Sequence, residues 1–314
     1  MFKRVGIFGG GSLGSVIGAV FKLSGVDVTL IGRKSQHLQT VKQKGLCLAD
    51  RFSESQVNIP VALCEDEPRA QFDLLIILVK TFDTHDAIQQ ILKCMDDRSV
   101  VLTLQNGLGA ERILVDALGQ DRVVIGRTFI GGDITRPGHV AAGYLNKLTT
   151  IGFSDGSDSE LLIWVKDLFE ASGLQLKISN KIWGTVWDKL LVNVGTGAVS
   201  AISGSCYGEL YQSEELKHIG CDLIAEGIEV ANIKGIELYC ADPEEIWISA
   251  GLGLPYHFKN SMLQSISSKR KTEIDFINGA VVDVGRKVGV KTPANAVVVD
   301  FVRAKESSYL DRRD

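Results

Sequence analysis

Near its start the chain reads Val5-Gly6-Ile7-Phe8-Gly9-Gly10-Gly11-Ser12-Leu13-Gly14, an apolar run followed by a glycine-rich turn. The turn fits the spacing G-x-G-x-x-G, in which the first glycine permits a tight turn and the second lets a pyrophosphate approach the backbone. The third lets the following helix pack closely on its strand, and the phosphates lie at that helix's amino terminus. The alternative is a glycine-rich turn that binds nothing. We expect dinucleotide binding through Gly9, Gly10, Gly11, Ser12, Leu13 and Gly14.

The first 180 residues alternate between two periodicities. Apolar runs of strand length occur at 5–8, 26–31, 74–79, 100–104 and 123–125, with helix-like stretches between them at 13–23, 37–44, 84–92 and 110–118. Continuous apolar strands separated by helices predict a parallel sheet that is covered on both faces. We therefore expect an α/β fold with an N-terminal Rossmann-type doubly wound sheet, and ligands beyond the carboxyl ends of its strands.

Beyond residue 179 the strand pattern ends. Apolar residues then recur every three or four positions at Trp183, Trp187, Leu191, Val194, Ala198 and Ile202, which is one face of a long helix. Further helical patterns cover 216–233, 243–248 and 272–288. We expect an all-helical C-terminal domain over residues 181–314, after a sheet domain over residues 1–180.

The residues after the second apolar run bear on which cofactor is bound. That run ends in Gly32-Arg33-Lys34. An NAD site usually places Asp or Glu there to hold the ribose 2′-hydroxyl, whereas Arg accommodates a 2′-phosphate. Arg33 therefore predicts NADP(H), the alternative being that both basic residues are solvated loop charges.

Composition excludes several classes of protein. Among 314 residues, 34 are basic and 38 acidic, a net charge of −4 that gives no footprint for nucleic acid. No apolar stretch approaches the roughly 20 residues of a membrane span, and Met1-Phe2-Lys3-Arg4-Val5 leads straight into a strand, so we expect no signal peptide. Six scattered cysteines without C-x-x-C pairing predict reduced thiols in the cytoplasm. Five unclustered histidines predict no metal site.

Polar residues follow two later strands and line one later helix. Lys80 and Gln105-Asn106-Gly107 stand at strand ends, although Asn-Gly is also a plain turn signal. Lys189, Asn193 and Gly197 are spaced i, i+4, i+8 and share one helix face. Lys189 is bordered by apolar residues, and burial would lower its pKa and ease proton donation. The alternative is a solvated surface charge.

Six segments, in order along nearly the whole chain, resemble the ketopantoate reductase (2-dehydropantoate 2-reductase) family. They are Gly9-x-Gly11-x-x-Gly14, Lys80, Gln105-Asn106-Gly107, Trp187-x-Lys189-Leu190-x-x-Asn193, Asn260-Ser261-Met262-Leu263-Gln264 and Thr272-Glu273-Ile274-Asp275. The resemblance implies an NADPH-dependent reductase with an N-terminal NADP-binding domain and a helical substrate and catalytic domain. The active site would lie between the two domains.

The resemblance also implies roles for individual residues. Lys189 would be the general acid that protonates the ketone oxygen, and Glu273 the carboxylate that contacts the cofactor ribose or the reacting hydroxyl and steadies Lys189. Asn193 and Ser261 would bind substrate, and Asn106 would contact both cofactor and substrate. On the cofactor side the resemblance implies Lys80 and the backbone near Gly132.

Without the resemblance, Ser261 and Glu273 can each be interpreted as residues with a purely structural role. Ser261-x-x-Gln264 and Thr272-x-x-Asp275 both fit a capping box, so Ser261 would be a helix cap. On the same interpretation Glu273 would be an acid in the first turn of a helix, where it complements the helix dipole.

The substrate side departs from the family pattern in two places. Gly197 stands where the family has a second asparagine, and Tyr207 where another asparagine commonly precedes Gly208-Glu209-Leu210. A hydroxyl left without its partner costs about 1–3 kcal/mol. Either water or Tyr207 replaces the amide, or the substrate lacks that hydroxyl and Gly197 makes room for a bulkier apolar group.

Three hypotheses follow. The first is reduction of ketopantoate to D-pantoate, a step of pantothenate biosynthesis. The second is reduction of another branched or aromatic 2-keto acid by a D-2-hydroxy acid dehydrogenase. The third is a non-catalytic NADP-binding regulator. Each predicts a small-molecule ligand and neither nucleic acid nor membrane as partner, and the mean hydropathy of +0.12 allows a homodimer.

Overall fold

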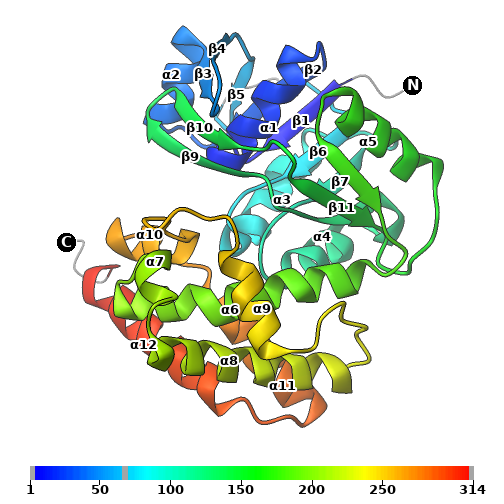
Figure 1. Cartoon of the computed structure of the whole chain (residues 1–314). Coiled ribbons are helices and arrows are strands. Elements are labelled where there is room, and N and C mark those ends of the chain that lie inside the picture. The colour runs from blue at the N-terminus through cyan, green and yellow to red at the C-terminus, as the bar shows by residue number, and fades with distance from the viewer. Residues whose placement is uncertain (1–3, 66–69, 311–314) are drawn as a thin grey trace. The chain divides into compact units, whose positions relative to one another are not determined.

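The computed structural model describes residues 4–65 and 70–310, so that Met1–Lys3 of the expected lead into the first strand lie outside it. The chain divides into two compact units (Figure 1). The first contains the residues up to Gln105 together with Ala110–Ile182. The second contains Asn106–Gly109 and the chain from Trp183 onward. The assignment of Asn106–Gly109 to the second unit was not anticipated from the sequence.

The first unit is built on an eight-stranded sheet of order β12-β11-β8-β7-β6-β1-β2-β5. Only β8 and β11 pair antiparallel; the other neighbours are parallel. The chain runs from β1 outward to β2 and β5 and then restarts at β6, which places a topological switch point between β1 and β6. The predicted doubly wound sheet is therefore confirmed. Its strands are β1 (Arg4–Phe8), β2 (Asp27–Gly32), β5 (Val61–Leu63), β6 (Leu74–Ile77), β7 (Val100–Thr103), β8 (Val123–Thr128), β11 (Leu148–Gly152) and β12 (Gln175–Ile178).

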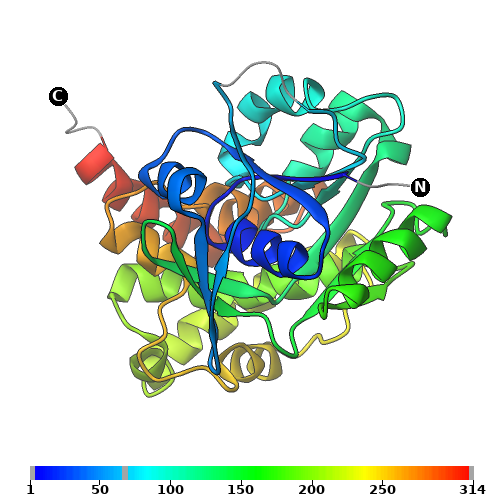
Figure 2. The same cartoon turned by 90° about the horizontal axis from the view of Figure 1, so that it is seen from above.

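Helices cover both faces of this sheet. Figure 2 looks onto the face that carries α1 (Ser12–Leu23), in dark blue, and α5 (Glu160–Ala171), in green. These two helices share one core, in which the rings of Phe21 and Phe169 meet edge to face at 5.1 Å. A second core lies under α3 (Thr84–Leu92) and α4 (Ala110–Leu118). The remaining helical segments of this unit are α2 (Gln36–Lys44), η1 (Thr81–Asp83) and η2 (Gln120–Arg122).

A second, four-stranded sheet belongs to the same unit and was not predicted. Its order is β4-β3-β10-β9, with β3 and β10 parallel and the outer pairs antiparallel. Alternate residues such as Leu46, Leu48 and Val140 are buried in the core beside α1, so the opposite face carries more polar side chains. The strands are β3 (Leu46–Ala49), β4 (Glu54–Val57), β9 (Gly131–Arg136) and β10 (His139–Gly143).

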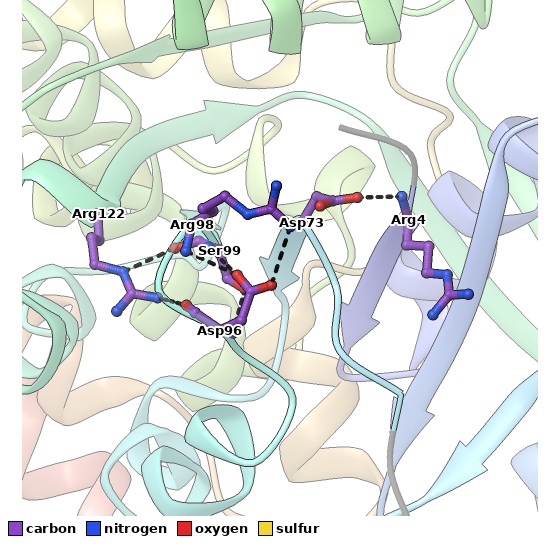
Figure 3. Close-up of polar contacts among 6 residues, drawn as sticks. All are labelled: Arg4, Asp73, Asp96, Arg98, Ser99 and Arg122. Atoms are coloured by element: carbon purple, nitrogen blue, oxygen red, sulfur yellow. Dashed lines mark hydrogen bonds and ion pairs between the residues drawn. The ribbon is translucent and has the colours of Figure 1, made fainter. Parts of the chain in front are cut away.

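Polar contacts fasten the amino ends of the large sheet's strands (Figure 3). The Arg4 N–H, in β1, donates to the carboxylate of Asp73 at 2.8 Å, just before β6. The Arg122 guanidinium donates to the carbonyls of Asp96 and Ser99, just before β7. The Asp96 carboxylate in turn accepts the Ser99 backbone N–H at 3.0 Å. Side-chain hydrogen bonds thus connect β1 with the segment that leads into β6, and Arg122 with the segment that leads into β7.

The second unit is helical: every described element after Ile178 is a helix. The expected apolar face of α6 is confirmed, because Trp187, Leu191 and Val194 are buried. The expectation of one helix over 272–288 is wrong at its start, since η3 and α11 are separate. The elements are α6 (Ile182–Ser203), α7 (Tyr207–Leu210), α8 (Glu214–Ile233), α9 (Pro243–Gly251), α10 (Ser261–Ser267), η3 (Ile274–Phe276), α11 (Asn278–Val288) and α12 (Pro293–Leu310).

Two broader expectations concern membranes and disulfides. In the described ranges 4–65 and 70–310, no helix has both the length and the apolar character that crossing a bilayer requires. All six cysteines lie in these ranges, and no disulfide joins any of them.

Candidate functional site

The glycine-rich turn lies on the switch point of the large sheet. Gly9 has φ +118°, and a Cβ built there would lie 2.5 Å from the Leu78 carbonyl carbon, just beyond β6. A Cβ on Gly14 would collide with the carbonyl oxygen of Gly9. The protein's own packing therefore requires both glycines, because any larger residue would force the turn away from β6 or α1 away from the turn.

Gly11 differs from the other two glycines of the motif. A Cβ built on it would meet no atom within 4 Å, so no packing contact of the described protein requires a glycine there. Gly11 is also the N-cap of α1 and brings no side chain to the helix's first N–H groups. The first backbone N–H groups of α1 receive no hydrogen bond from a capping side chain, and the space beside Gly11 is open. Such a helix amino terminus suits a phosphate. These residues fit the diphosphate of a dinucleotide cofactor.

The neighbouring strand ends lie on the same edge of the sheet. Arg33 follows β2 and its side chain is 77% exposed, with Nη2 2.8 Å from a carboxylate oxygen of Asp83. Lys80 follows β6, is exposed, and precedes η1. Gly132, in β9, lies against α1, because a Cβ there would be 2.6 Å from a methyl of Val16. The first unit thus brings the glycine turn, Arg33 and Lys80 to one edge.

Gln105 fixes the end of β7. Its side chain is buried, and Nε2 donates to the Val79 carbonyl at 2.9 Å and to Thr84 Oγ1 at 2.8 Å. The residue therefore links the ends of β6 and β7, and it determines where the chain leaves the sheet toward Asn106. The sequence motif marks Gln105, but no local pattern indicates that its side chain links two strand ends, because Val79 and Thr84 lie more than 20 residues earlier in the chain.

The loop that contains Asn106 packs on the turn that contains Glu273. The Leu108 N–H donates to the Phe276 carbonyl at 2.8 Å. Gly107 has φ +78°, and a Cβ there would collide with the same carbonyl. The Asn-Gly turn signal is thus correct, and the structure places half-buried Asn106 beside the η3 segment that directly follows Glu273.

Two asparagine side chains hold α6 at the turn that follows Asn193. Asn278 Nδ2, from α11, donates to the Val194 carbonyl at 3.1 Å. Asn260 Nδ2 donates to the Thr196 carbonyl at 3.2 Å, which ties the start of α10 to α6. Asn193 itself is half-buried, as is Lys189 one turn earlier on the same face.

The capping interpretations of Ser261 and Glu273 are wrong. Asn260 caps α10, with Oδ1 accepting the Leu263 N–H at 2.9 Å. Ser261 is therefore the first residue of the helix, with an exposed hydroxyl that the cap does not use. Thr272 Oγ1 accepts the N–H of Ile274, two residues on, and Glu273 precedes a short 3₁₀ turn. The Glu273 side chain is buried, with 6% of its surface exposed. It is therefore not a solvent-exposed acid that complements the dipole of a helix.

The structure shows which residues surround Gly197 and Tyr207, the two departures from the family pattern. A Cβ on Gly197 would lie 3.5 Å from the terminal methyl of Met262, an ordinary contact, so the methionine borders the place of the absent amide. Tyr207 is only 6% exposed, and its hydroxyl donates to Thr196 Oγ1 at 3.2 Å. The Tyr207 hydroxyl thus already has a hydrogen-bond partner inside the helical unit.

Comparison with known proteins covers almost the whole chain. Residues 5–156 match the family model described as Ketopantoate reductase PanE/ApbA, and residues 181–306 match the model of its C-terminal part. A 2-dehydropantoate 2-reductase from Pyrococcus horikoshii is 31% identical over 304 residues, 97% of this chain and 98% of that protein. One from Halobacterium salinarum is 30% identical over 303 residues, 96% of this chain and 98% of that protein.

Among solved structures, a ternary complex of D-mandelate dehydrogenase with NADH and anilino(oxo)acetate has a TM-score of 0.88. It is 27% identical in sequence, over 98% of this chain and 99% of that one. Sequence relatives and structural neighbours thus carry names of enzymes with different substrates.

Proposed function

The chain belongs to the ketopantoate reductase family and is an oxidoreductase of that type, and on that premise we propose that it reduces ketopantoate to D-pantoate with NADPH. The observation that carries the proposal is the anchoring of α6 directly beyond Asn193 by Asn278 and Asn260. The two hydrogen bonds fix the part of α6 that directly follows Asn193, and Asn260 is followed in the chain by Ser261, which supports a common role for Asn193 and Ser261.

A bound reduced nicotinamide would supply the hydride that reduces the ketone carbon. The chain's own part in the proposal is to bind and orient the keto acid and to move one proton. Lys189, half-buried on α6, donates its Nζ proton to the ketone oxygen. Asn193 and Ser261 bind the substrate's polar groups, and Asn106 contacts both ligands. Glu273, from its buried position, steadies the lysine.

The nicotinamide cofactor follows from the family, and we propose its phosphorylated form. Gly9, Gly10, Gly11, Ser12, Leu13 and Gly14 would hold the diphosphate, with Lys80 and Gly132 nearby. The guanidinium of Arg33, 77% exposed at the end of β2, would meet the 2′-phosphate. Titration with each cofactor, followed by nicotinamide fluorescence, tests this directly: tenfold tighter binding of NADH than of NADPH would reject the proposal.

One observation favours a second candidate substrate class. The place of the absent amide is bordered by the Met262 methyl, and the Tyr207 hydroxyl is used inside the unit. A branched or aromatic 2-keto acid without the hydroxyl of ketopantoate would leave no polar group unpaired there. The likeness to a D-mandelate dehydrogenase agrees with this class.

The decisive experiment is an NADPH oxidation assay on a panel of ketopantoate, 2-ketoisovalerate and benzoylformate. The highest kcat/KM on ketopantoate supports the first proposal, and the highest on either other acid supports the second. No oxidation with any of them rejects both and favours a regulator that binds NADP.

The same assay tests the proton donor. Lys189→Ala should lower kcat at least a hundredfold, since positioned acid catalysis contributes about 10²–10⁴-fold. NADPH affinity should be retained, and the exposed Lys287→Ala serves as a matched control on another helix. Turnover that survives Lys189→Ala would remove the lysine from this role.

A further inference from the structure

The outer face of the four-stranded sheet gathers a thiol, a carboxylate and an imidazole from three adjacent strands. Cys47 lies on β3, Glu54 on β4 and His139 on β10. Strand register pairs Cys47 with His139, and Glu54 lies opposite Ala49, which shares a face with Cys47. One ligand atom from each of the three lies within 4.8 Å of the others. No sequence motif announces this group, because strand pairing alone brings the three residues together.

The separations are close to those of a tetrahedral metal site. Cys47 Sγ donates to Glu54 Oε1 at 2.6 Å, and His139 Nδ1 is 3.8 Å from the same oxygen. Zinc bonds of about 2.0–2.3 Å place neighbouring ligand atoms roughly 3.4–3.6 Å apart. Shifts of roughly an ångström would therefore suffice. The Glu54 side chain is 65% exposed and free of core packing, so it can make them.

We propose that Cys47, Glu54 and His139 bind a divalent transition metal ion of the zinc class. Thiolate and imidazole together select such ions over calcium or magnesium, which prefer oxygen ligands. Three protein ligands leave one position, on the solvent side, for water. The strand ladders fix all three backbones, so the metal would join β4, β3 and β10 across the sheet.

Two features of the cluster limit the affinity. Arg136 Nη2 lies 3.3 Å from His139 Nδ1, and this exposed side chain must turn away before the ring nitrogen can ligate. The Cys47 thiol uses its proton in the hydrogen bond that it donates to Glu54 Oε1. The metal must therefore displace a proton. Binding should release about one proton.

The test is a titration of the reduced, metal-stripped protein with Co²⁺, read by its thiolate-to-cobalt charge-transfer absorption. We expect one equivalent of Co²⁺ to bind, Zn²⁺ to displace it, and pH-indicator dye to record the released proton. Cys47→Ser should abolish the charge-transfer band, and His139→Gln should weaken binding at least tenfold. Because Cys47 is buried, the exposed Glu54→Gln provides a variant that leaves the core intact, with at least tenfold weaker binding expected.

Cys240→Ser is the matched control. Cys240 Sγ lies 3.5 Å from Glu245 Oε2 and so forms a thiol–carboxylate pair without the histidine. We expect the cobalt band to be unchanged in this variant. The proposal is overturned if the wild type shows no band at millimolar Co²⁺, if the band survives Cys47→Ser or is unaffected by Glu54→Gln, or if Cys240→Ser removes it.

Discussion

The hydroxyl of Tyr207 donates a hydrogen bond to Thr196 Oγ1 at 3.2 Å, and Thr196 Oγ1 donates onward to the Val192 carbonyl at 2.8 Å. The tyrosine is 6% exposed, and burial raises its pKa. Its proton therefore remains in a chain of hydrogen bonds inside the helical unit. The place of the amide absent at Gly197 is left with an apolar neighbour, Met262.

Gly197→Asn should shift the enzyme's preference toward ketopantoate. The new Cβ meets only the Met262 side chain, at 3.5 Å and beyond, so the helix tolerates it. An amide that pairs with a desolvated substrate hydroxyl is worth about 1–3 kcal/mol, which corresponds to roughly 5- to 150-fold in affinity. The measurement is the ratio of kcat/KM for ketopantoate to that for 2-ketoisovalerate, in the variant and in the wild type.

Two further variants control that substitution. Gly204→Asn places the same side chain at an exposed position with φ +78°, which Asn tolerates, and should leave the ratio unchanged. Tyr207→Phe should lower the free energy of unfolding by about 1 kcal/mol through the lost hydrogen bond, again with no change of ratio. A ratio that moves in Tyr207→Phe as much as in Gly197→Asn would contradict this view of the pocket.

Gly11→Ala and Gly14→Ala should fail in different ways. A methyl group at Gly11 enters open space, so the variant should melt within a few degrees of the wild type while NADPH affinity falls at least tenfold. A methyl group at Gly14 collides with the Gly9 carbonyl, so that variant should lose stability before any ligand is added. Thermal melts with and without NADPH separate the two effects. If Gly11→Ala bound NADPH as tightly as the wild type, the phosphates would not lie at this turn.

The sequence predicted the sheet well where strands are buried on both faces. Runs such as Leu74–Ile77 are apolar at every position, so composition alone marks them. β4 (Glu54–Val57) buries one residue fully and exposes Glu54 and Gln56, and such a short half-polar strand has no distinctive pattern. The small sheet was therefore missed, and with it the juxtaposition of Cys47, Glu54 and His139.

The candidate site was predictable only where it is local. The i, i+4 spacing of Lys189 and Asn193 follows from helix geometry. What holds α6 in place does not, because Asn278 lies 84 residues beyond Val194 and resembles any other polar helical residue in the sequence. Ser261 shows the opposite error: the local pattern fits a cap, but Asn260, one residue earlier, makes the hydrogen bond.

The ion pair of Arg33 with Asp83 predicts how cofactor preference can be tuned. Arg33→Ala should raise the KM for NADPH at least tenfold and leave the KM for NADH nearly unchanged, since only NADPH carries a 2′-phosphate. Asp83→Asn frees the guanidinium from its carboxylate at 2.8 Å and should tighten NADPH binding a few-fold. Initial rates with both cofactors at two salt concentrations measure this. Equal losses for NADPH and NADH in Arg33→Ala would place Arg33 away from the phosphate.

His37 should make the stability of the first unit depend on pH. Its ring is 8% exposed, with Nδ1 accepting the Gly138 N–H at 3.1 Å and Nε2 2.9 Å from Ser15 Oγ. Burial lowers the pKa of His37 below 6.5, so the unfolded chain takes up a proton at a higher pH than the folded one. The stabilisation is complete above pH 6.5, declines as pH falls through the folded pKa, and is constant below it.

The measurement is the free energy of urea unfolding between pH 8 and pH 5 for the wild type and for His37→Gln. The difference between the two cancels the titration of all other groups, and it should shrink steadily below pH 6.5. His85→Gln removes a histidine that is 87% exposed, and its difference from the wild type should stay constant with pH. A constant difference for His37→Gln as well would mean that folding does not shift the pKa of His37, because the folded and unfolded chains would then bind its proton equally at every pH.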